Sequence, residues 1–418
     1  MQKLQPKLFE SLKTYSGAQL IKDVLAGIIV AIIALPLSIA LAIASGATPE
    51  MGLYTAIFAG FVISLLGGSR VQIAGPTAAF ATIVAGIIAT KGFEGLALST
   101  ILAGLILVLM GLFRLGSLIR FIPHSITVGF TGGIAVTIAV GQIKDFLGLT
   151  FTHSPVETME KVAAVFESMG TFMPMALAVG LVALVILILV PKIPGLKRVP
   201  GSLIAILICA ALVQFCTPGV KTIGDLYTIS AGFPPFRFPE ITGASILAAL
   251  PDAFTIAILA AVESLLSCVV ADGMIGDKHN SNMELVAQGA GNIASALFGG
   301  IPATGAIART AANVKNGGTS PVSGMVHAVV LLLVLLVLMP LAALIPMPVI
   351  AAILFVVAYN MSEWRKFVAI FKEKKVTDII VLLVTFFLTV IFDLVVAIAV
   401  GLVLAGIFVL FEKMKKRA

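Results

Sequence analysis

Two charged side chains lie in stretches that otherwise have the composition of a membrane span. Arg309 lies in FGGIPATGAIARTAANVKNGG (298–318), and Glu263 is the only acid in ILAAVESLLSCVV (258–270). A charge at the centre of a membrane helix costs about 2.5–3.5 kcal/mol on insertion scales, so it normally faces a cavity or a partner. We therefore expect Arg309 to provide positive potential for a buried anion, or to form a salt bridge with Glu263.

Glu263 is a candidate proton carrier, because desolvation disfavours the charged form of an isolated carboxyl group. Ser267 lies four residues later on the same helical face and could hydrogen-bond to either protonation state. An equally good interpretation of Ser267 is a hydrogen bond between two helices. We expect Glu263 and Ser267 to couple an ion to transport, with a proton favoured over sodium.

Proline and glycine interrupt two of the apolar stretches. Gly75 and Pro76 precede Thr77, and Pro302 precedes Thr304, so neither preceding segment continues easily as a helix. We predict that helices begin near Thr77 and Thr304, inside the membrane. Each start leaves unpaired N–H groups and a partial positive charge, which together favour an anion. The two threonines could cap their helices or donate to a bound oxyanion.

The residues around these two threonines are small. Ala78, Ala79, Ala303, Gly305 and Ala306 add little bulk, so backbone amides can approach a ligand closely. We predict that the two helix starts form one anion site at the middle of the membrane.

The composition is that of a polytopic membrane protein rather than a soluble one. Hydrophobic residues make up 60% of the 418 residues and charged residues only 11%, with a mean hydropathy of +1.15, whereas about a quarter of globular residues are charged. We interpret the net charge of +7 as a bias toward the cytoplasmic loops, not as nucleic-acid binding. The three cysteines have no CxxC or histidine pairing, and no enzyme motif of the HExxH or GxSG type occurs. We therefore expect no cofactor, no metal site and no enzyme activity.

Apolar runs of sufficient length predict about fourteen crossings. The first seven predicted spans cover residues 24–45, 50–67, 77–90, 97–113, 122–146, 172–190 and 201–216. The second seven cover residues 247–270, 284–299, 304–315, 320–339, 345–360, 377–392 and 393–411.

The basic residues predict that both termini are cytoplasmic. Only five of them fall outside in this threading: Lys91, Lys144, Lys161, Lys221 and Arg237. Residues 363–376 are typical of an amphipathic helix on the inner membrane surface. The predicted location is the inner membrane of a bacterium.

Two pairs of segments are similar to each other at a separation of about 225 residues. GGSRVQIAGPTAAFATIVAG (67–86) resembles the segment that contains Arg309, and RFIPHSITVGF (120–130) resembles ALIPMPVIAAI (343–353). Seven crossings per half is an odd number, so the second half must run through the membrane inverted. Inverted repeats of this kind are typical of secondary transporters.

These segments closely resemble the SulP anion permeases, the bacterial relatives of the SLC26 anion transporters. The similarity covers essentially the whole chain and is carried by DVLAGIIVAIIALPLSIALAIASG (23–46), GPTAAF (75–80), AAVESLLSCVVADGMIGDKH (260–279) and GGIPATGAIARTAANV (299–314). The segments at 269–293 and 359–368 look most like the branch that transports C4-dicarboxylates such as succinate, fumarate and aspartate. Sulfate or bicarbonate transport remains an alternative.

The resemblance implies an all-α fold of seven-plus-seven inverted repeats that move as an elevator. It implies a cytoplasmic tail (1–22), a core domain of spans 1–4 (23–116) and 8–11 (246–339), and a gate domain of spans 5–7 (117–217) and 12–14 (340–412). The usual C-terminal STAS domain is expected to be absent, and Ala308 replaces a serine that many relatives have. The expected partners are a small anion, a coupling proton, membrane lipid and a second copy of the chain. The substrate-site prediction is Thr77, Ala78, Ala79, Phe80, Ala303, Thr304, Gly305, Ala306, Arg309, Ser38 and Leu41.

Three other functions use the same features. An uncoupled anion channel on this scaffold would give single-channel currents. An intramembrane enzyme would need a catalytic arrangement that we do not find. A nucleobase carrier would not need two positive helix ends and an arginine.

Overall fold

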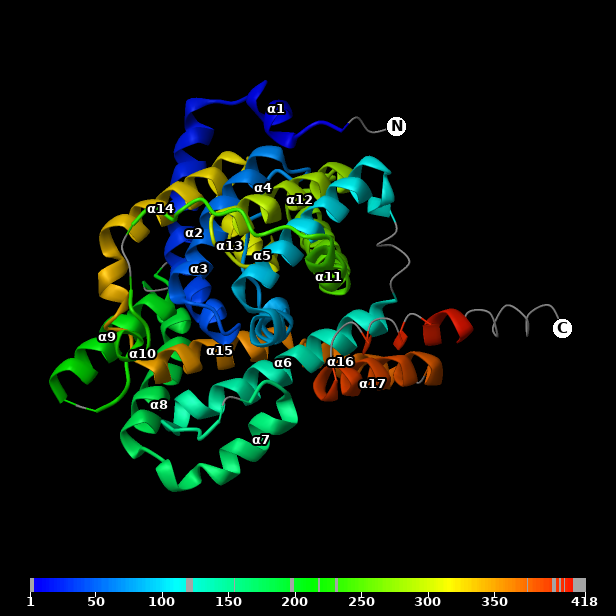
Figure 1. Ribbon diagram of the computed structural model, residues 1–418. Helices are drawn as coiled ribbons and strands as arrows, with labels where there is room; N and C mark the ends of the chain where they lie inside the picture. The colour runs from blue at the N-terminus through cyan, green and yellow to red at the C-terminus, as the bar shows by residue number, and fades with distance from the viewer. Residues whose placement is uncertain are drawn as a thin grey trace.

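The protein is a bundle of helices with very little β structure (Figure 1). The computed structural model describes residues 4–117, 123–153, 155–195, 199–216, 219–229, 232–373, 375–392, 396–397, 400–401 and 403–408. Within these ranges the strands are β1 (Ala74–Gly75) and β2 (Thr304–Gly305), which pair with each other. The predicted all-α class is therefore confirmed.

Eight helical stretches in the described part of the chain are long and apolar enough to cross a membrane. They are Gly17–Ala44, Pro49–Leu66, Ala78–Leu112, His124–Leu147, Pro174–Lys192, Gly243–Ile275, Val322–Ala342 and Met347–Lys372. Two shorter apolar helices are α9 (Gly201–Cys216) and α17 (Val376–Ile391). The count of fourteen spans stays a prediction, and the structure describes only part of the last predicted span, 393–411.

The helices pack in two groups. The first group fills the upper half of Figure 1, where α5 packs along α11 and α12 while α14 packs on α2 and α4. Gly104 of α5 and Gly289 of α12 face each other so closely that a Cβ on either would overlap the other helix. Such small residues let membrane helices approach. The elements are α2 (Gly17–Ala44), α3 (Pro49–Tyr54), η1 (Thr55–Ala59), α4 (Gly60–Leu66), η2 (Ala78–Phe80), α5 (Ala81–Leu112), α11 (Gly243–Ile275), α12 (Ser281–Leu297), α13 (Ile307–Lys315) and α14 (Val322–Ala342).

The second group fills the lower half of Figure 1. Here α6 packs against α15 and α17, and α8 packs against α9 and α15. Gly129 and Gly133 of α6 lie directly against α17. The elements besides α9 and α17 are α6 (His124–Leu147), α7 (Thr158–Glu167), η4 (Met169–Thr171), α8 (Pro174–Leu189), η5 (Val190–Lys192), α10 (Ile223–Leu226), α15 (Met347–Met361) and α16 (Trp364–Lys372).

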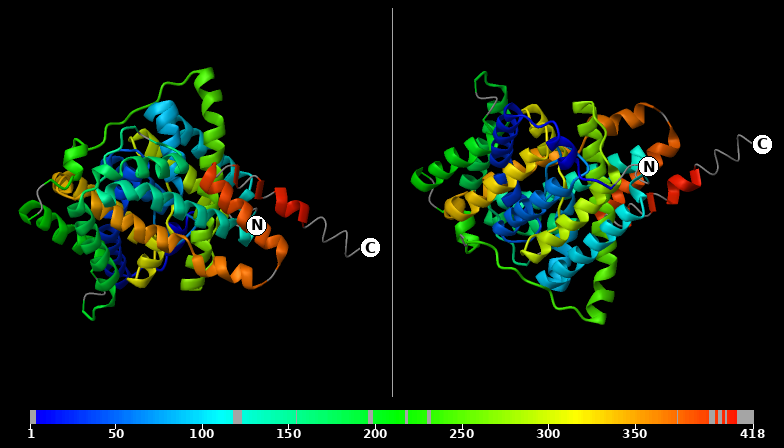
Figure 2. Two further views of the ribbon diagram at one scale, coloured as in Figure 1. Left: turned by 90° about the horizontal axis from the view of Figure 1, so that it is seen from below. Right: turned by 90° about the horizontal axis from the view of Figure 1, so that it is seen from above.

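Few elements join the two groups, which overlap in Figure 2 because its views look along the direction that separates them in Figure 1. The long helix α2 contacts α9 and α15, and η2 contacts α6. The start of the segment that begins at η2 therefore lies where the two groups meet.

Two predicted boundaries can be compared with the structure. The predicted spans 77–90 and 97–113 correspond to the two parts of α5, which meet at Gly92, where the backbone leaves helical geometry (φ 67°, ψ −172°). A glycine adopts this positive φ at little steric cost. The predicted helix start near Thr77 is confirmed, because a 3₁₀ turn begins at Ala78 with Thr77 as its N-cap residue, whereas α13 begins later than predicted, at Ile307 rather than near Thr304.

Candidate functional site

The two interrupted segments meet as paired strands. Strands β1 and β2 are antiparallel, with Ala74 opposite Gly305 and Gly75 opposite Thr304. The N–H of Ala306 donates to the carbonyl of Ile73 at 2.8 Å and extends this pairing. Because the strands are antiparallel, the helices that follow them leave in opposite directions. The predicted residues 77–80 and 303–306 are thereby brought side by side.

Arg309 lies in the first turn of α13 and is almost fully buried, with 3% of its surface exposed. Its Nη2 donates to the carbonyl of Pro76 at 2.7 Å, and its Nη1 has no hydrogen-bond partner. The guanidinium group lies against Gly75, where a Cβ would come closer than 3.0 Å to Nη1. Arg309 therefore braces the segment in front of η2 across the strand pair.

The salt bridge between Arg309 and Glu263 is not formed among the described residues. Instead, Glu263 Oε2 accepts a hydrogen bond from the Thr77 hydroxyl at 2.8 Å. Pro76 and Thr77 are consecutive, so α13 and α11 hold adjacent residues of the same segment. The two opposite charges each bind the chain rather than each other.

Glu263 and Thr77 are both only partly buried, although their neighbours are covered. On α11, Leu259, Ala260 and Ser267 lie one turn from Glu263 on the same face, and each is at most 1% exposed. The uncovered part of Glu263 therefore lies toward the inside of the bundle. Thr77 and Glu263 therefore meet at a point where neither side chain is fully covered.

The two threonines do not cap their helices. Thr77 is the N-cap residue of η2, but its side chain makes no cap hydrogen bond; its hydroxyl donates to Glu263 instead. Thr304 lies in β2, and its hydroxyl is 2.8 Å from that of Ser264. The N-cap residue of α13 is Ala306, which has no side chain for this purpose. The two helix starts thus lack a side-chain oxygen acceptor for their first N–H groups.

Ser267 does not contact Glu263. Its hydroxyl donates to Thr310 of α13 at 3.3 Å, and Thr310 Oγ1 accepts from the N–H of Ile73 at 3.0 Å. The bond between helices is the interpretation that the geometry favours for Ser267. Its contribution to ion coupling stays a prediction.

The remaining predicted site residues are buried. Ser38 and Leu41 of α2 are 0% and 4% exposed, and the Ser38 hydroxyl has no hydrogen-bond partner. Leu41 belongs to the same apolar cluster as Ala78, Ala79 and Phe80. The packing thus connects α2 with η2, and a binding role for these residues stays a prediction.

Several polar residues that position the strands were missed from the sequence. Ser264 Oγ accepts from the N–H of Gly305 at 3.0 Å. Asn292 of α12 accepts from the N–H of Ala303 at 2.8 Å and donates to its carbonyl at 2.9 Å. Thr55 Oγ1 accepts from the N–H of Ile301 at 2.7 Å. One signal was available: α12 carries Glu284, Gln288, Asn292 and Ser295 at helical spacing, among small residues.

The arrangement is suited to binding rather than to bond chemistry. It combines two helix starts, one buried guanidinium group and one partly uncovered carboxyl group. In the part of the chain that the structure describes, no three His, Cys, Asp or Glu side chains are placed to hold a metal ion. The N–H groups and the positive charge can accept an oxyanion.

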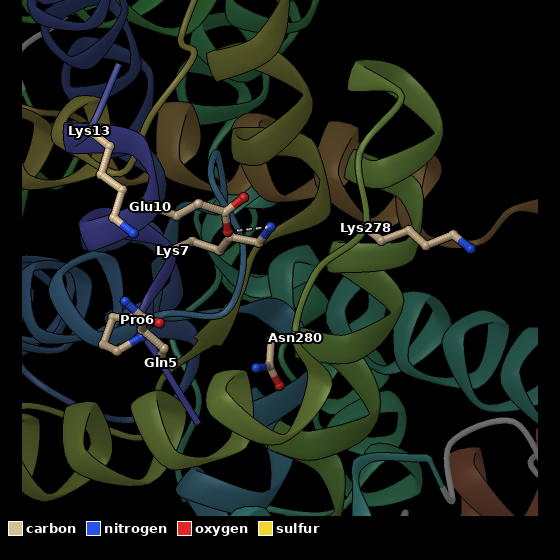
Figure 3. Close-up of a pocket in the computed structure, with 7 residues that line it drawn as sticks. All are labelled: Gln5, Pro6, Lys7, Glu10, Lys13, Lys278 and Asn280. Atoms are coloured by element: carbon tan, nitrogen blue, oxygen red, sulfur yellow. Dashed lines mark ion pairs between the residues drawn. The ribbon is translucent and has the colours of Figure 1, made fainter. Parts of the chain in front are cut away.

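A pocket of about 280 Å³ lies on the surface, away from this site (Figure 3). It is formed by the segment around α1 (Lys7–Leu12) and by the turn between α11 and α12. Lys7 contacts Glu10 at 2.9 Å there, as the dashed line in Figure 3 shows. The pocket shares no lining residue with the strand pair, so it has no part in the candidate site.

Comparisons with known proteins identify the family of the chain. A model of the sulfate permease family matches residues 20–385. The Bacillus subtilis protein named "Putative sulfate transporter YvdB" is 49% identical over 95% of this chain and 74% of its own length. The bicarbonate transporter BicA of Picosynechococcus sp. is 33% identical over 92% of this chain and 69% of its own length.

Solved structures show the same fold. The transmembrane domain of a cyanobacterial bicarbonate transporter BicA matches with a TM-score of 0.80 and 29% identity, over 94% of this chain and 98% of that domain. SLC26A9 matches with a TM-score of 0.89 at 21% identity, over 98% of this chain and 68% of that protein, and this likeness concerns the fold alone. The chain therefore belongs to the sulfate permease family and is an anion transporter of that family.

Proposed function

We propose that this protein is a secondary active transporter that moves a small oxyanion across the inner membrane of a bacterium, with both termini in the cytoplasm. The observation that carries the proposal is the strand pair, from which two uncapped helix starts leave in opposite directions beside the buried Arg309. Helix starts that have a positive potential and no side-chain cap favour a ligand whose own oxygens accept hydrogen bonds from their N–H groups.

The substrate class that we propose first is inorganic: sulfate or bicarbonate. The relatives carry the names of sulfate and bicarbonate transporters. Nothing in the comparisons supports the predicted C4-dicarboxylates, which stay in the test as an alternative. The backbone N–H groups of the two helix starts would supply most of the contacts, because Ala308 offers no hydroxyl group.

Coupling to protons would follow from the contact between Thr77 and Glu263. While Glu263 is ionised, it accepts a hydrogen bond from the Thr77 hydroxyl and repels an anion at the same place. Protonation removes the repulsion and frees that hydroxyl group to donate to the anion. Proton and anion would then each favour the binding of the other, as linkage requires.

The motion would be a displacement of the first helix group against the second. Only α2, η2 and a few other elements connect the groups, and η2 lies where they meet. A site at this boundary could be exposed to either side of the membrane in turn. The first and second groups would then be the core and gate domains expected from the sequence.

The test is uptake of radiolabelled sulfate, bicarbonate and succinate into proteoliposomes with imposed proton or sodium gradients. We expect sulfate or bicarbonate uptake that an inward proton gradient increases. Glu263→Gln should abolish the response to the proton gradient while anion exchange continues. Uptake no greater than that of empty liposomes for all three anions would refute the proposal, and an unchanged proton response in Glu263→Gln would remove Glu263 from coupling.

A further inference from the structure

The interior of the first helix group contains a second carboxyl group, far from solvent. Glu284 of α12 is 0% exposed and forms no ion pair among the described residues. Its Oε2 accepts from the N–H of Gly68 at 2.9 Å. Its Oε1 accepts from Gln72 Nε2 at 2.6 Å and from Gln288 Nε2 at 2.8 Å. A group this deeply buried is costly unless such bonds are made.

The residue that Glu284 orients, Gln72, contacts three other elements. Its Nε2 donates to Glu284, so its Oε1 points the other way and accepts from the Cys268 thiol of α11 at 3.0 Å. The same amide lies against Gly305 of β2, where a Cβ would overlap it. Gln72 is two residues before β1. One amide thus links α11, α12 and both strands.

Gly68 is held at the other end of the same short segment. Residues 68–73 have no helical bonds of their own, so their path depends on contacts with other elements. Gly68 and Gln72 bond to α12, while Val71 and Ile73 bond to α13. The N–H of Asn280, at the start of α12, also donates to the carbonyl of Gly68 at 2.9 Å. The position of β1, and with it of Thr77, therefore depends on α12 through Glu284.

We propose that Glu284 is a positioning residue for the anion site, acting through Gly68 and Gln72 to fix β1 against β2. The inference rests on the function proposed above. Glu284 does not touch the anion. It orients the Gln72 amide, because a carboxylate accepts hydrogen bonds at both oxygens. In Glu284→Gln, the new NH₂ group replaces an oxygen that now accepts a hydrogen bond, so two N–H donors would face each other.

An exchange of the two residues provides the sharpest test. In Glu284→Gln, the new NH₂ group faces either the N–H of Gly68 or the NH₂ groups of Gln72 and Gln288. In Glu284→Gln/Gln72→Glu, the new amide at position 284 can accept from Gly68 and donate to the new carboxylate at position 72. That carboxylate can still accept from the Cys268 thiol. Gln288 Oε1 has no partner in the structure and can take the second proton of the amide at position 284 after its own amide turns over.

Two measurements separate this inference from the proposed function. The first is the rate at which a small methanethiosulfonate labels the native Cys268 thiol. The other two cysteines are removed by Cys209→Ala and Cys216→Ser, so that Cys268 is the one thiol labelled. We expect Glu284→Gln to raise this rate at least tenfold and the exchanged pair to return it to within threefold. Glu94→Gln, the same change at an exposed position, should leave the rate unchanged.

The second measurement is the KM and maximal rate of sulfate and bicarbonate uptake. We expect KM to rise about tenfold in Glu284→Gln, as for loss of a bond to a charged group. The maximal rate per folded molecule should change less, and the exchanged pair should recover most of the affinity. General destabilisation would lower the amount of folded protein without this selective recovery.

Other outcomes overturn the inference. An unchanged Cys268 labelling rate in Glu284→Gln would show that Glu284 does not hold Gln72, whether or not the protein transports anything. A lower KM would show that the carboxyl group acts by repelling the anion. If Glu284→Gln does not fold, Gln72→Met removes the same link more mildly, and an unchanged labelling rate and KM there would be equally decisive. A wild-type protein that takes up no anion contradicts the proposed function but leaves the labelling result interpretable.

Discussion

Gly75→Ala tests whether the position of Arg309 determines anion affinity. A Cβ at residue 75 would come closer than 3.0 Å to Arg309 Nη1, a separation that real Cβ atoms essentially never show. The next atoms it would meet are the Cα and Cβ of Ala56, at 3.5 Å. The guanidinium group must therefore move, because it is the only neighbour that is too close.

The size of the effect follows from the bond that this movement breaks. Arg309 Nη2 donates to the carbonyl of Pro76 at 2.7 Å, and a hydrogen bond to a charged group contributes about 1.5–3 kcal/mol. Since 1.4 kcal/mol corresponds to a factor of ten, losing this bond should weaken anion binding by about 10- to 100-fold. The change leaves the charge itself in place, but it also strains the backbone, because Gly75 has a φ of +159° that other residues rarely adopt. The double-mutant cycle below separates the two effects.

The assay is the concentration dependence of sulfate and bicarbonate uptake in proteoliposomes. Gly86→Ala is the matched control, because it lies on α5 and a Cβ there would meet nothing within 4 Å. A double-mutant cycle with Arg309→Met tests the route of the effect: once Arg309 is gone, Gly75→Ala should cost little more. Wild-type affinity in Gly75→Ala, or full additivity in the cycle, would refute the proposal that Arg309 sets anion affinity by holding the segment before η2.

Three further predictions follow from other contacts. Thr77→Val removes the donor to Glu263, so anion affinity should fall about 2- to 10-fold and depend less on pH. Thr90→Val is the control, because the Thr90 hydroxyl bonds only within α5, and it should leave both the affinity and its pH dependence unchanged. Asn292→Leu leaves the buried N–H and carbonyl of Ala303 without their hydrogen bonds to Asn292, which costs about 1–3 kcal/mol of stability for each group. It should lower the melting temperature in detergent far more than Asn316→Ala, because the Asn316 amide bonds to the last turn of α13, the helix it caps. The Lys7 hydrogen bond holds the pKa of Glu10 below its usual 4.5, so the stability that this charge adds is present above pH 4.5 and is lost as the pH falls through the lower folded value. Limited proteolysis of the N-terminal segment should therefore become faster below about pH 4.5 in the wild type and depend less on pH in Glu10→Gln.

The sequence is sufficient to place the interruptions. Proline alone does not place them, because Pro36, Pro251 and Pro340 lie inside helices. Pro76 and Pro302 each follow glycine within two residues, and this combination favours a broken segment. Their exact helix starts do not follow. Residues 304 and 305 became a strand because β1 pairs with them, and that pairing joins segments about 230 residues apart in the chain.

The supporting polar residues could not be assigned partners from the sequence for the same reason. The spacing of Glu284, Gln288 and Asn292 shows that they share one face of a helix, but not what that face contacts. Glu284 bonds to Gly68 and Gln72, more than 200 positions earlier. Helical periodicity identifies a polar stripe, whereas its function depends on which segment the fold lays against it.

The salt bridge between Glu263 and Arg309 was one of two alternatives from the sequence, and its absence among the described residues bears on the proposed function. The segment that precedes η2 gives each charged group a separate partner. The Thr77 hydroxyl bonds to Glu263, and the carbonyl of Pro76 accepts from Arg309. A direct ion pair would tie the carboxylate to its cation and make its protonation more costly. With the charges apart, protonation of Glu263 leaves the positive charge of Arg309 uncompensated at the start of η2. We expect this change in net charge, and not a contact of Arg309 with the substrate, to make anion binding depend on the proton.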